Sequence, residues 1–290
     1  MGLKEMTTSF DAAALATFNN LYPETSGTLR HQLVDHPLLQ LDRLAEFASR
    51  IDPANVEYNI GQLPVGIDPA AVPGNGLSIE ETVRSIEQNG SWMVLKWIEN
   101  DPDYRALLHE ALAPLQPYVA PKTGEMLTLQ GFIFVSSPGA VTPYHMDPEH
   151  NILLQIRGDK VMTVFPQVDD QLLSDQDHER YHLGGHRNLV WQDEFAAKGK
   201  PVPLAPGDAI YVPVKAPHWV KVGKELSISL SITWRSNWSY READARGFNS
   251  VLREMGLAPR APGRFPSQNH AKSLAFRAIR RVKGLVGTKG

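Results

Sequence analysis

The sequence predicts a mainly β protein: a double-stranded β-helix, or double-sheet jelly roll, with an N-terminal α/β region and C-terminal helices. Between residues 121 and 240, short apolar runs alternate with turn signals such as Arg157-Gly158-Asp159 and Pro206-Gly207-Asp208, a spacing typical of antiparallel strands. Helical patterns lie mostly outside this stretch. Two candidate metal ligands within it lie 73 positions apart (218 − 145), which is compatible with one site because a jelly roll brings distant strands together.

Residues 1–120 are predicted to form a mixed α/β region packed on this barrel. Apolar residues at helical spacing predict helices over residues 10–22 and 41–51, and alternation over residues 56–60 predicts a strand. Ser78 and Glu81 form a capping box that opens a helix toward residue 89. Asp101 followed by Pro102 opens another helix, which stops near residue 114.

The barrel itself is predicted over residues 121–240, and its strands are expected at residues 126–135, 151–156, 160–165, 209–214, 219–222 and 226–234. Residues 167–200 form an insertion without clear periodicity. Long loops at a jelly-roll mouth often form lids or binding surfaces, so a lid is one reading of this insertion. Residues 241–290 form a C-terminal helical segment, with helices expected over 244–255 and 270–286.

His145 and Asp147 are the first candidate ligand pair. Residues two apart on a strand project from the same face, so both side chains can reach one point. A second histidine, most plausibly His218 at the start of a later strand, completes the two-His-one-carboxylate set of non-haem Fe(II) oxygenases. His-x-Asp alone is a weak motif, and a surface turn is its ordinary alternative. With no cysteine in the chain, any metal must use His, Asp or Glu.

Lys160 is a candidate anchor for an anionic ligand. It opens a predicted strand among apolar neighbours, and a buried ammonium without a partner is costly. The two readings are an exposed turn lysine and a residue that pairs with a ligand carboxylate.

The candidate ligands and Lys160 belong to one longer sequence motif. A Thr-Pro-x-His-x-Asp element is followed by an Asn, by a Gly-x-Lys turn and by a distal His, at Thr142–Asp147, Asn151, Gly158–Lys160 and His218. The pattern resembles the Jumonji-C (JmjC) and cupin-like 2-oxoglutarate oxygenases, and it is most similar to that of the asparaginyl hydroxylase that inhibits hypoxia-inducible factor. The resemblance covers residues 130–234.

The resemblance implies roles for six residues. His145, Asp147 and His218 would bind Fe(II). Lys160 would pair with the C5 carboxylate of 2-oxoglutarate, Thr142 would donate to that carboxylate, and Asn151 would be a nearby polar contact.

One departure from the pattern concerns the last strand. It ends Ile232-Thr233-Trp234, without the Asn that the asparaginyl hydroxylase carries there, which puts substrate choice in doubt.

Two polar patterns lie outside these motifs. His182 and His186 could be mistaken for a metal pair, but the two glycines between them favour a solvated or substrate-facing loop. Over residues 226–234, hydroxyl residues alternate with apolar ones. The hydroxyls face either the barrel interior, where they would suit a polar cofactor, or solvent.

Charge is distributed unevenly along the chain. Residues 255–290 hold eight Lys and Arg and no acidic residue, which leaves −11 for the rest, given the total of −3. The last predicted helix is basic and amphipathic, with a stripe of Leu274, Ala278, Val282 and Leu285. Such a helix could meet a membrane surface, nucleic acid or an acidic partner, dock in a homodimer, or simply pack on the body.

Composition restricts the setting. No run of eighteen apolar residues predicts a membrane span, and the N-terminus lacks an apolar signal core. The absence of cysteine fits a reducing, cytoplasmic compartment.

The resemblance to the JmjC and cupin-like oxygenases implies that the chain is an Fe(II)- and 2-oxoglutarate-dependent dioxygenase. The reaction expected is hydroxylation of a C–H bond in a protein or peptide side chain, coupled to use of O₂ and decarboxylation of 2-oxoglutarate. Two alternatives stay open. One is a hydroxylase of a small amino-acid-like or natural-product molecule, and the other is a non-catalytic cupin-type binding or regulatory module.

Overall fold

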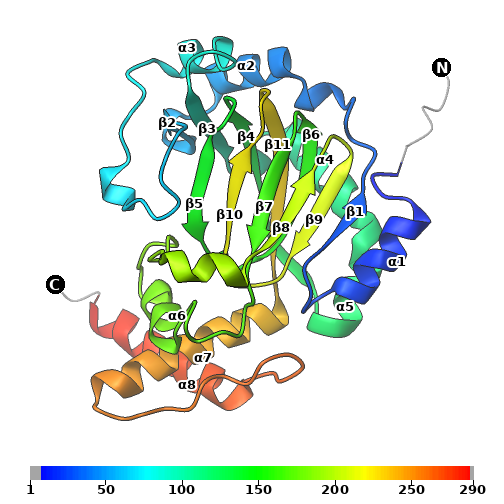
Figure 1. Ribbon diagram of the computed structural model, residues 1–290. Helices are drawn as coiled ribbons and strands as arrows, with labels where there is room; N and C mark the ends of the chain where they lie inside the picture. Colours follow the sequence, from blue (N-terminus) through cyan, green and yellow to red (C-terminus); the bar gives the residue numbers. More distant parts are fainter. Residues whose placement is uncertain (1–7, 288–290) are drawn as a thin grey trace.

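Two antiparallel sheets face each other in the computed structural model, which describes residues 8–287 (Figure 1). The larger sheet has seven strands in the spatial order β1 (Gly27–Arg30), β9 (Asp208–Val212), β6 (His150–Arg157), β11 (Ser227–Ser236), β4 (Met126–Ser136), β3 (Ser91–Lys96) and β2 (Val56–Ile60). The smaller sheet has the order β5 (Val141–His145), β10 (His218–Val222), β7 (Lys160–Val164) and β8 (Lys200–Leu204). Strands far apart in the chain are neighbours in both sheets, as the predicted jelly roll requires.

Helices from the N-terminal region cover the outer face of the larger sheet. They are α1 (Ala12–Leu21), α2 (Leu41–Arg50), α3 (Ile79–Arg84), α4 (Pro102–Leu112) and α5 (Gln116–Thr123). Their apolar stripes join one buried cluster with the outward side chains of the sheet, such as Ile133, Ile152 and Ile232. The same region also supplies β1, β2 and β3 to the sheet, so its strands extend the barrel wall.

The inner face of the larger sheet packs on the smaller sheet. Leu153 and Ile210 from β6 and β9 meet Met162 and Val220 from β7 and β10 in a second apolar cluster. Polar residues of β6, β7 and β11 lie on the same inner face and line a cavity together with Leu153, Met162 and Val220 of this cluster.

Strand β11 resolves the alternative left open by its alternation. Ile228, Leu230 and Ile232 belong to the helix-covered cluster, so Ser227, Ser229, Ser231 and Thr233 point into the barrel, where each is at most 4% exposed. The hydroxyls therefore face the interior, and not the solvent.

Three helices lie beyond the barrel. The insertion holds α6 (Asp175–His182), and the C-terminal segment forms α7 (Asn237–Glu254) and α8 (His270–Gly287), which lie together below the sheets (Figure 1). Helix α7 begins seven residues before the expected start at 244, because Ser236 and Ser239 cap it. Among the described residues, no helix is both long and apolar enough to cross a membrane.

Helix α8 packs with a different face from the one its sequence marks as apolar. Ser273 is buried, and Phe276 lies over Gly247 of α7, where an added Cβ would come within 2.3 Å of the ring. Leu274 and Val282 of the predicted stripe are 66% and 60% exposed. The part of the apolar stripe whose side chains the structure describes is therefore turned outward.

Candidate active site

The three predicted metal ligands converge at the end of the smaller sheet. His145 is the last residue of β5 and His218 the first of β10, and the two are direct antiparallel partners. Asp147 follows two residues after β5. Ligand atoms of the three side chains all lie within 4.8 Å of one another, and they form the only such group of His, Cys, Asp and Glu among the described residues. The alternative pair, His182 and His186, is not part of a metal-ligating group.

Backbone carbonyls orient both histidines for ligation. The Nδ1 atoms of His145 and His218 lie 2.7 Å from the Pro143 carbonyl and 2.9 Å from the Ala216 carbonyl. A carbonyl can only accept, so each Nδ1–H donates and each Nε2 keeps its lone pair for a metal. Burial and the neighbouring His218 lower the pKa of His145 to about 3, which keeps this ring neutral.

Asp147 is held as a charged ligand from several sides. Burial alone would favour its neutral form, but His145 and Arg187 outweigh burial and lower its pKa to about 2. Arg187 donates to Oδ1 at 3.0 Å and Asn151 Nδ2 donates to Oδ2 at 3.1 Å. Two neutral imidazoles and one carboxylate, with further hydrogen bonds around them, fit the donor set that non-haem iron uses.

Asn151 thus lies against a candidate metal ligand. Its Oδ1 accepts a hydrogen bond of 2.8 Å from Ser231, which leaves its amide N–H groups directed at Asp147. The structure supplies a contact that motif reading alone did not give: Asn151 orients Asp147, and Ser231 orients Asn151.

Lys160 is buried and almost without partners. It is 4% exposed, its amine donates to Ser229 Oγ at 2.8 Å, and burial lowers its pKa to about 7. No carboxylate pairs with it within the described part of the chain. The exposed-turn reading is therefore excluded, and the amine is available for an anion that enters the barrel.

Thr142 lies in the same cavity as Lys160. Its Oγ1 accepts a hydrogen bond of 3.0 Å from Trp92 Nε1, so its own hydroxyl proton stays free to donate. The cavity has a volume of about 490 Å³ and is lined by all six predicted site residues. That volume holds a small diacid together with part of a second molecule.

The wall of the cavity comes from segments on both sides of the metal ligands. Trp92, Phe132 and Phe134 from β3 and β4 form an aromatic part of the wall, and Tyr181 and Arg187 from the insertion form another part. Sequence reasoning missed Arg187, since the insertion carries no periodic signal. It pointed toward Ser229 and Ser231 only through the alternation of β11.

The fold and site together define a jelly-roll protein with a candidate His-Asp-His metal centre. A model of the cupin-like domain matches residues 79–240. The chain belongs to the cupin-like domain family, and the resemblance seen in the sequence to the JmjC and cupin-like group is confirmed. The narrower similarity to the asparaginyl hydroxylase stays a prediction.

Curated relatives match over part of the chain. The chain is 31% identical over 103 residues to lysine-specific demethylase 8 of Danio rerio, covering 33% of this chain and 25% of that protein. It is 32% identical over 102 residues to Jumonji C domain-containing protein 5 of Drosophila melanogaster, covering 33% and 25%. The chain thus spans about a quarter of the length of these relatives.

A solved structure, that of ycfD from E. coli, matches over more of the chain. It superposes with a TM-score of 0.50 at 16% identity and covers 91% of this chain and 66% of that one. This similarity shows a shared fold.

Proposed function

We propose that this chain is an Fe(II)- and 2-oxoglutarate-dependent oxygenase that hydroxylates a side chain of a protein or peptide. The observation that carries the proposal is the meeting of two kinds of group in one cavity. His145, Asp147 and His218 form a metal-type cluster, and the buried, unpaired Lys160 lines the same cavity. A structural metal site needs no such lysine, whereas a metal that shares its cavity with a dicarboxylate does.

His145, Asp147 and His218 would hold the metal on one face. When bound, Fe(II) and 2-oxoglutarate supply the oxidative chemistry, in which O₂ is consumed and decarboxylation yields succinate and CO₂. The chain's own residues bind and orient. Lys160 and Thr142 donate to the distal carboxylate.

The surroundings of the metal cluster have two further tasks. Arg187 and Asn151 keep Asp147 ionised and directed at the metal. The aromatic residues of the cavity wall exclude water, which limits side reactions and favours oxidation of the substrate.

Succinate release is the direct test of the activity. Purified protein with Fe(II), ascorbate and 2-oxoglutarate should release succinate, and Asp147→Ala should abolish the release. Turnover by the variant equal to that of the wild type would contradict the assignment.

A second measurement distinguishes the enzyme from a non-catalytic binding module. Mn(II) and N-oxalylglycine, a 2-oxoglutarate analogue, should each raise the melting temperature, because a ligand at about 100 times its Kd stabilises the folded state by about 2.7 kcal/mol. A chain that neither compound stabilises would be the binding module.

A polypeptide substrate is favoured over a small molecule by the matched relatives, since the Danio rerio relative is named a lysine-specific demethylase. The cavity is also lined toward its mouth by polar and aromatic residues, Glu57, Lys96, Trp97 and Gln130. Substrate-stimulated succinate release, measured with a peptide pool and with free amino acids, separates the two classes. Stimulation by amino acids alone would make the protein a small-molecule hydroxylase.

The C-terminal helix supports a further proposal about partners. Leu274 and Val282 are exposed on α8 beside Arg280 and Arg281, an arrangement that suits an anionic partner. Removal of residues 269–290 should abolish salt-sensitive binding to anionic vesicles or nucleic acid and leave succinate release intact. A shift from dimer to monomer on the same removal would identify α8 as a homodimer contact.

A further inference from the structure

The turn that joins β9 to β10 contains a lysine in an unusual conformation. Lys215 has φ 63°, in the left-handed region that glycine adopts most readily. Its side chain is also buried, with 3% of the residue exposed. A buried lysine in a strained backbone position persists only where the surroundings determine it strongly, and such positions cluster at functional sites.

The backbone of this turn holds two of the three candidate ligands. The Lys215 N–H donates to the Asp147 carbonyl at 2.7 Å, and the next carbonyl, that of Ala216, accepts from His218 Nδ1 at 2.9 Å. The turn is closed by a bond of 3.1 Å from the Ala216 N–H to the Pro213 carbonyl. The backbone conformation at Lys215 therefore determines the position of the Asp147 backbone and the rotation of the His218 ring.

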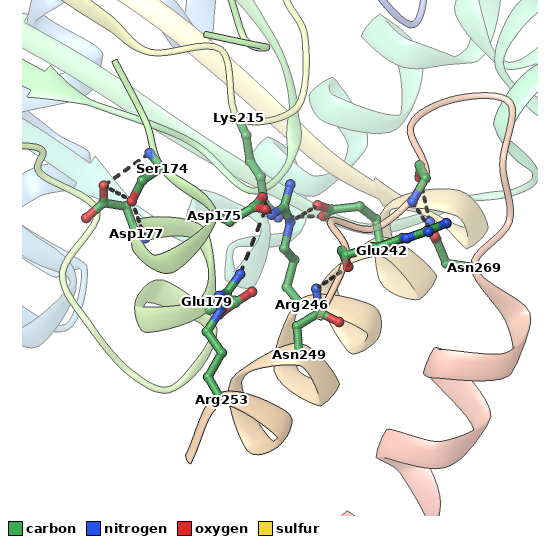
Figure 2. Close-up of polar contacts among 12 residues, drawn as sticks. Ser174, Asp175, Asp177, Glu179, Lys215, Glu242, Arg246, Asn249, Arg253 and Asn269 are labelled. Atoms are coloured by element: carbon green, nitrogen blue, oxygen red, sulfur yellow. Dashed lines mark hydrogen bonds and ion pairs between the residues drawn. The ribbon is translucent and has the colours of Figure 1, made fainter. Parts of the chain in front are cut away.

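The side chain of Lys215 runs the other way, into a buried group of charges (Figure 2). Its amine pairs with Glu242 of α7, whose other carboxylate oxygen accepts from Arg246 at 2.9 Å. Arg246 in turn pairs with Asp175 at the start of α6. The side chains of Lys215, Glu242 and Arg246 are only 4%, 9% and 7% exposed. We refer to these four residues as the Lys215 cluster.

We propose that Lys215 is a positioning residue that fixes the metal ligands to the helical layer: its side chain anchors the turn to α7 and α6, and its backbone holds Asp147 and His218 in place. The proposal rests on the assignment of His145, Asp147 and His218 as the metal site.

The insertion reaches the same ligand from the opposite side. Helix α6 leads into Arg187, which donates to the Asp147 carboxylate, while Lys215 holds the Asp147 backbone. The ion pair between Arg246 and Asp175 joins α6 to α7. It thus links the segment that carries Arg187 to the turn that carries Lys215, and both residues contact Asp147. Loss of the Arg246–Asp175 contact, which belongs to the Lys215 cluster, would therefore affect Asp147 both through Lys215 and through Arg187.

Mn(II) affinity of the metal-free protein is the measurement that tests the proposal, by titration calorimetry. Lys215→Met removes the charge but leaves Glu242 its partner Arg246, so no carboxylate is left unpaired. Substitutions of groups that orient metal ligands typically weaken metal binding about 10- to 100-fold. We expect a Kd at least about tenfold higher for Lys215→Met and a rise in the same direction for the isosteric Glu242→Gln.

The double variant Lys215→Met/Glu242→Gln should bind Mn(II) no more weakly than whichever single variant binds it more weakly. The reason is that the two substitutions remove the same interaction, the Lys215–Glu242 ion pair.

Arg253→Gln is the matched control. It removes the 2.7 Å ion pair between Arg253 and Glu179, which joins the same two helices. Its one ion pair with the Lys215 cluster, among the described residues, is a long contact of 4.0 Å between Arg253 Nη2 and Asp175 Oδ2. The Mn(II) Kd of this variant should stay within about twofold of the wild type, because no metal-ligand contact depends on Arg253.

Hydrogen exchange of the backbone amides over residues 213–218 supplies a readout that needs no metal. Loss of the anchor should speed exchange there in Lys215→Met and Glu242→Gln, but not in Arg253→Gln. Faster exchange with wild-type Mn(II) affinity would overturn the link to the metal. Equal losses of affinity in Lys215→Met and Arg253→Gln would reduce the Lys215 cluster to a general stabilising role. A wild-type protein that binds no divalent ion would refute the proposed function itself.

Discussion

The affinity of the protein for 2-oxoglutarate should depend on pH through one buried amine. Lys160 is almost fully buried, and burial lowers its pKa to about 7. Only the charged amine can pair with the distal carboxylate of the ligand. Well below pH 7 the lysine is already protonated and binding takes up no proton, whereas above pH 7 binding is accompanied by uptake of a proton from solution onto Lys160.

The size of the effect follows from the charged fraction of Lys160. Apparent affinity falls in proportion to the binding-competent fraction, which is about a tenth at one pH unit above the pKa. The charged fraction is about one half at pH 7, so the apparent Kd should rise about five- to sixfold between pH 7 and pH 8, which corresponds to about 1 kcal/mol. The pKa rises in the complex, so proton uptake should approach one per ligand above pH 8.

Titration calorimetry on Mn(II)-saturated protein under anaerobic conditions measures both quantities, with proton uptake taken from two buffers of different ionisation enthalpy. The matched control is 2-oxopentanoate, which has the same carbon chain but lacks the distal carboxylate, and whose affinity should not follow Lys160. A flat 2-oxoglutarate affinity over this range, or an equal slope for 2-oxopentanoate, would refute the role of Lys160.

Three further predictions concern residues around the cavity. Lys160→Met should raise the melting temperature of the ligand-free protein at pH 7, since the native state no longer buries an uncompensated amine; this gain should shrink as pH rises from 7 toward 10.5, where the wild-type lysine is neutral in both states. Asn151→Ala should raise the Mn(II) Kd about tenfold by removing the 3.1 Å hydrogen bond to Asp147, and an unchanged Kd in calorimetry would show that Arg187 suffices. Thr233→Val should stabilise the ligand-free protein by about 1 kcal/mol in denaturant unfolding, because Thr233 is 4% exposed and its buried hydroxyl has no hydrogen-bond partner among the described residues; a loss of stability would reveal a partner for it.

The metal cluster could be predicted because its signals are local. Strand alternation puts His145 beside Asp147, and the turn before His218 marks where the distal strand begins. The position of Lys160 followed from the same hairpin, but its burial did not. Whether the start of β7 is exposed depends on β10 and β8 on either side of it, and no local pattern reports that.

Alternation in β11 fixed the period of the strand and left its direction open. A period of two separates two faces without saying which one is covered. The helices of residues 1–120 decide it, because they occupy the apolar side. Strand β1 was missed for a related reason: its four residues, Gly27–Arg30, carry no alternation of their own and become a strand by pairing with β9.

Helix α6 was not predicted because it packs through ion pairs and has no apolar stripe. Its sequence from Asp175 to His182 is polar throughout, and its start is marked only by the capping box of Ser174 and Asp177. Arg246 and Arg253 of α7 bind its carboxylates. The reverse happens on α8, where the apolar stripe faces outward and Ser273 and Phe276 face α7. Hydrophobic periodicity therefore misleads where charged contacts or an outward face set the packing.

The inner face of β11 explains why so many polar groups can be buried in one barrel. Ser227 binds Gln155, Ser229 binds Lys160 and Ser231 binds Asn151. Each serine thus positions one polar side chain, two of them on the adjacent strand β6 and one on β7 of the facing sheet, while the opposite face of β11 supplies the core beneath the helices. A strand with apolar residues on both faces would stabilise the barrel better. Ser229 and Ser231 instead hold Lys160 and Asn151, which place an amine and, through Asn151, the Asp147 carboxylate in the same cavity.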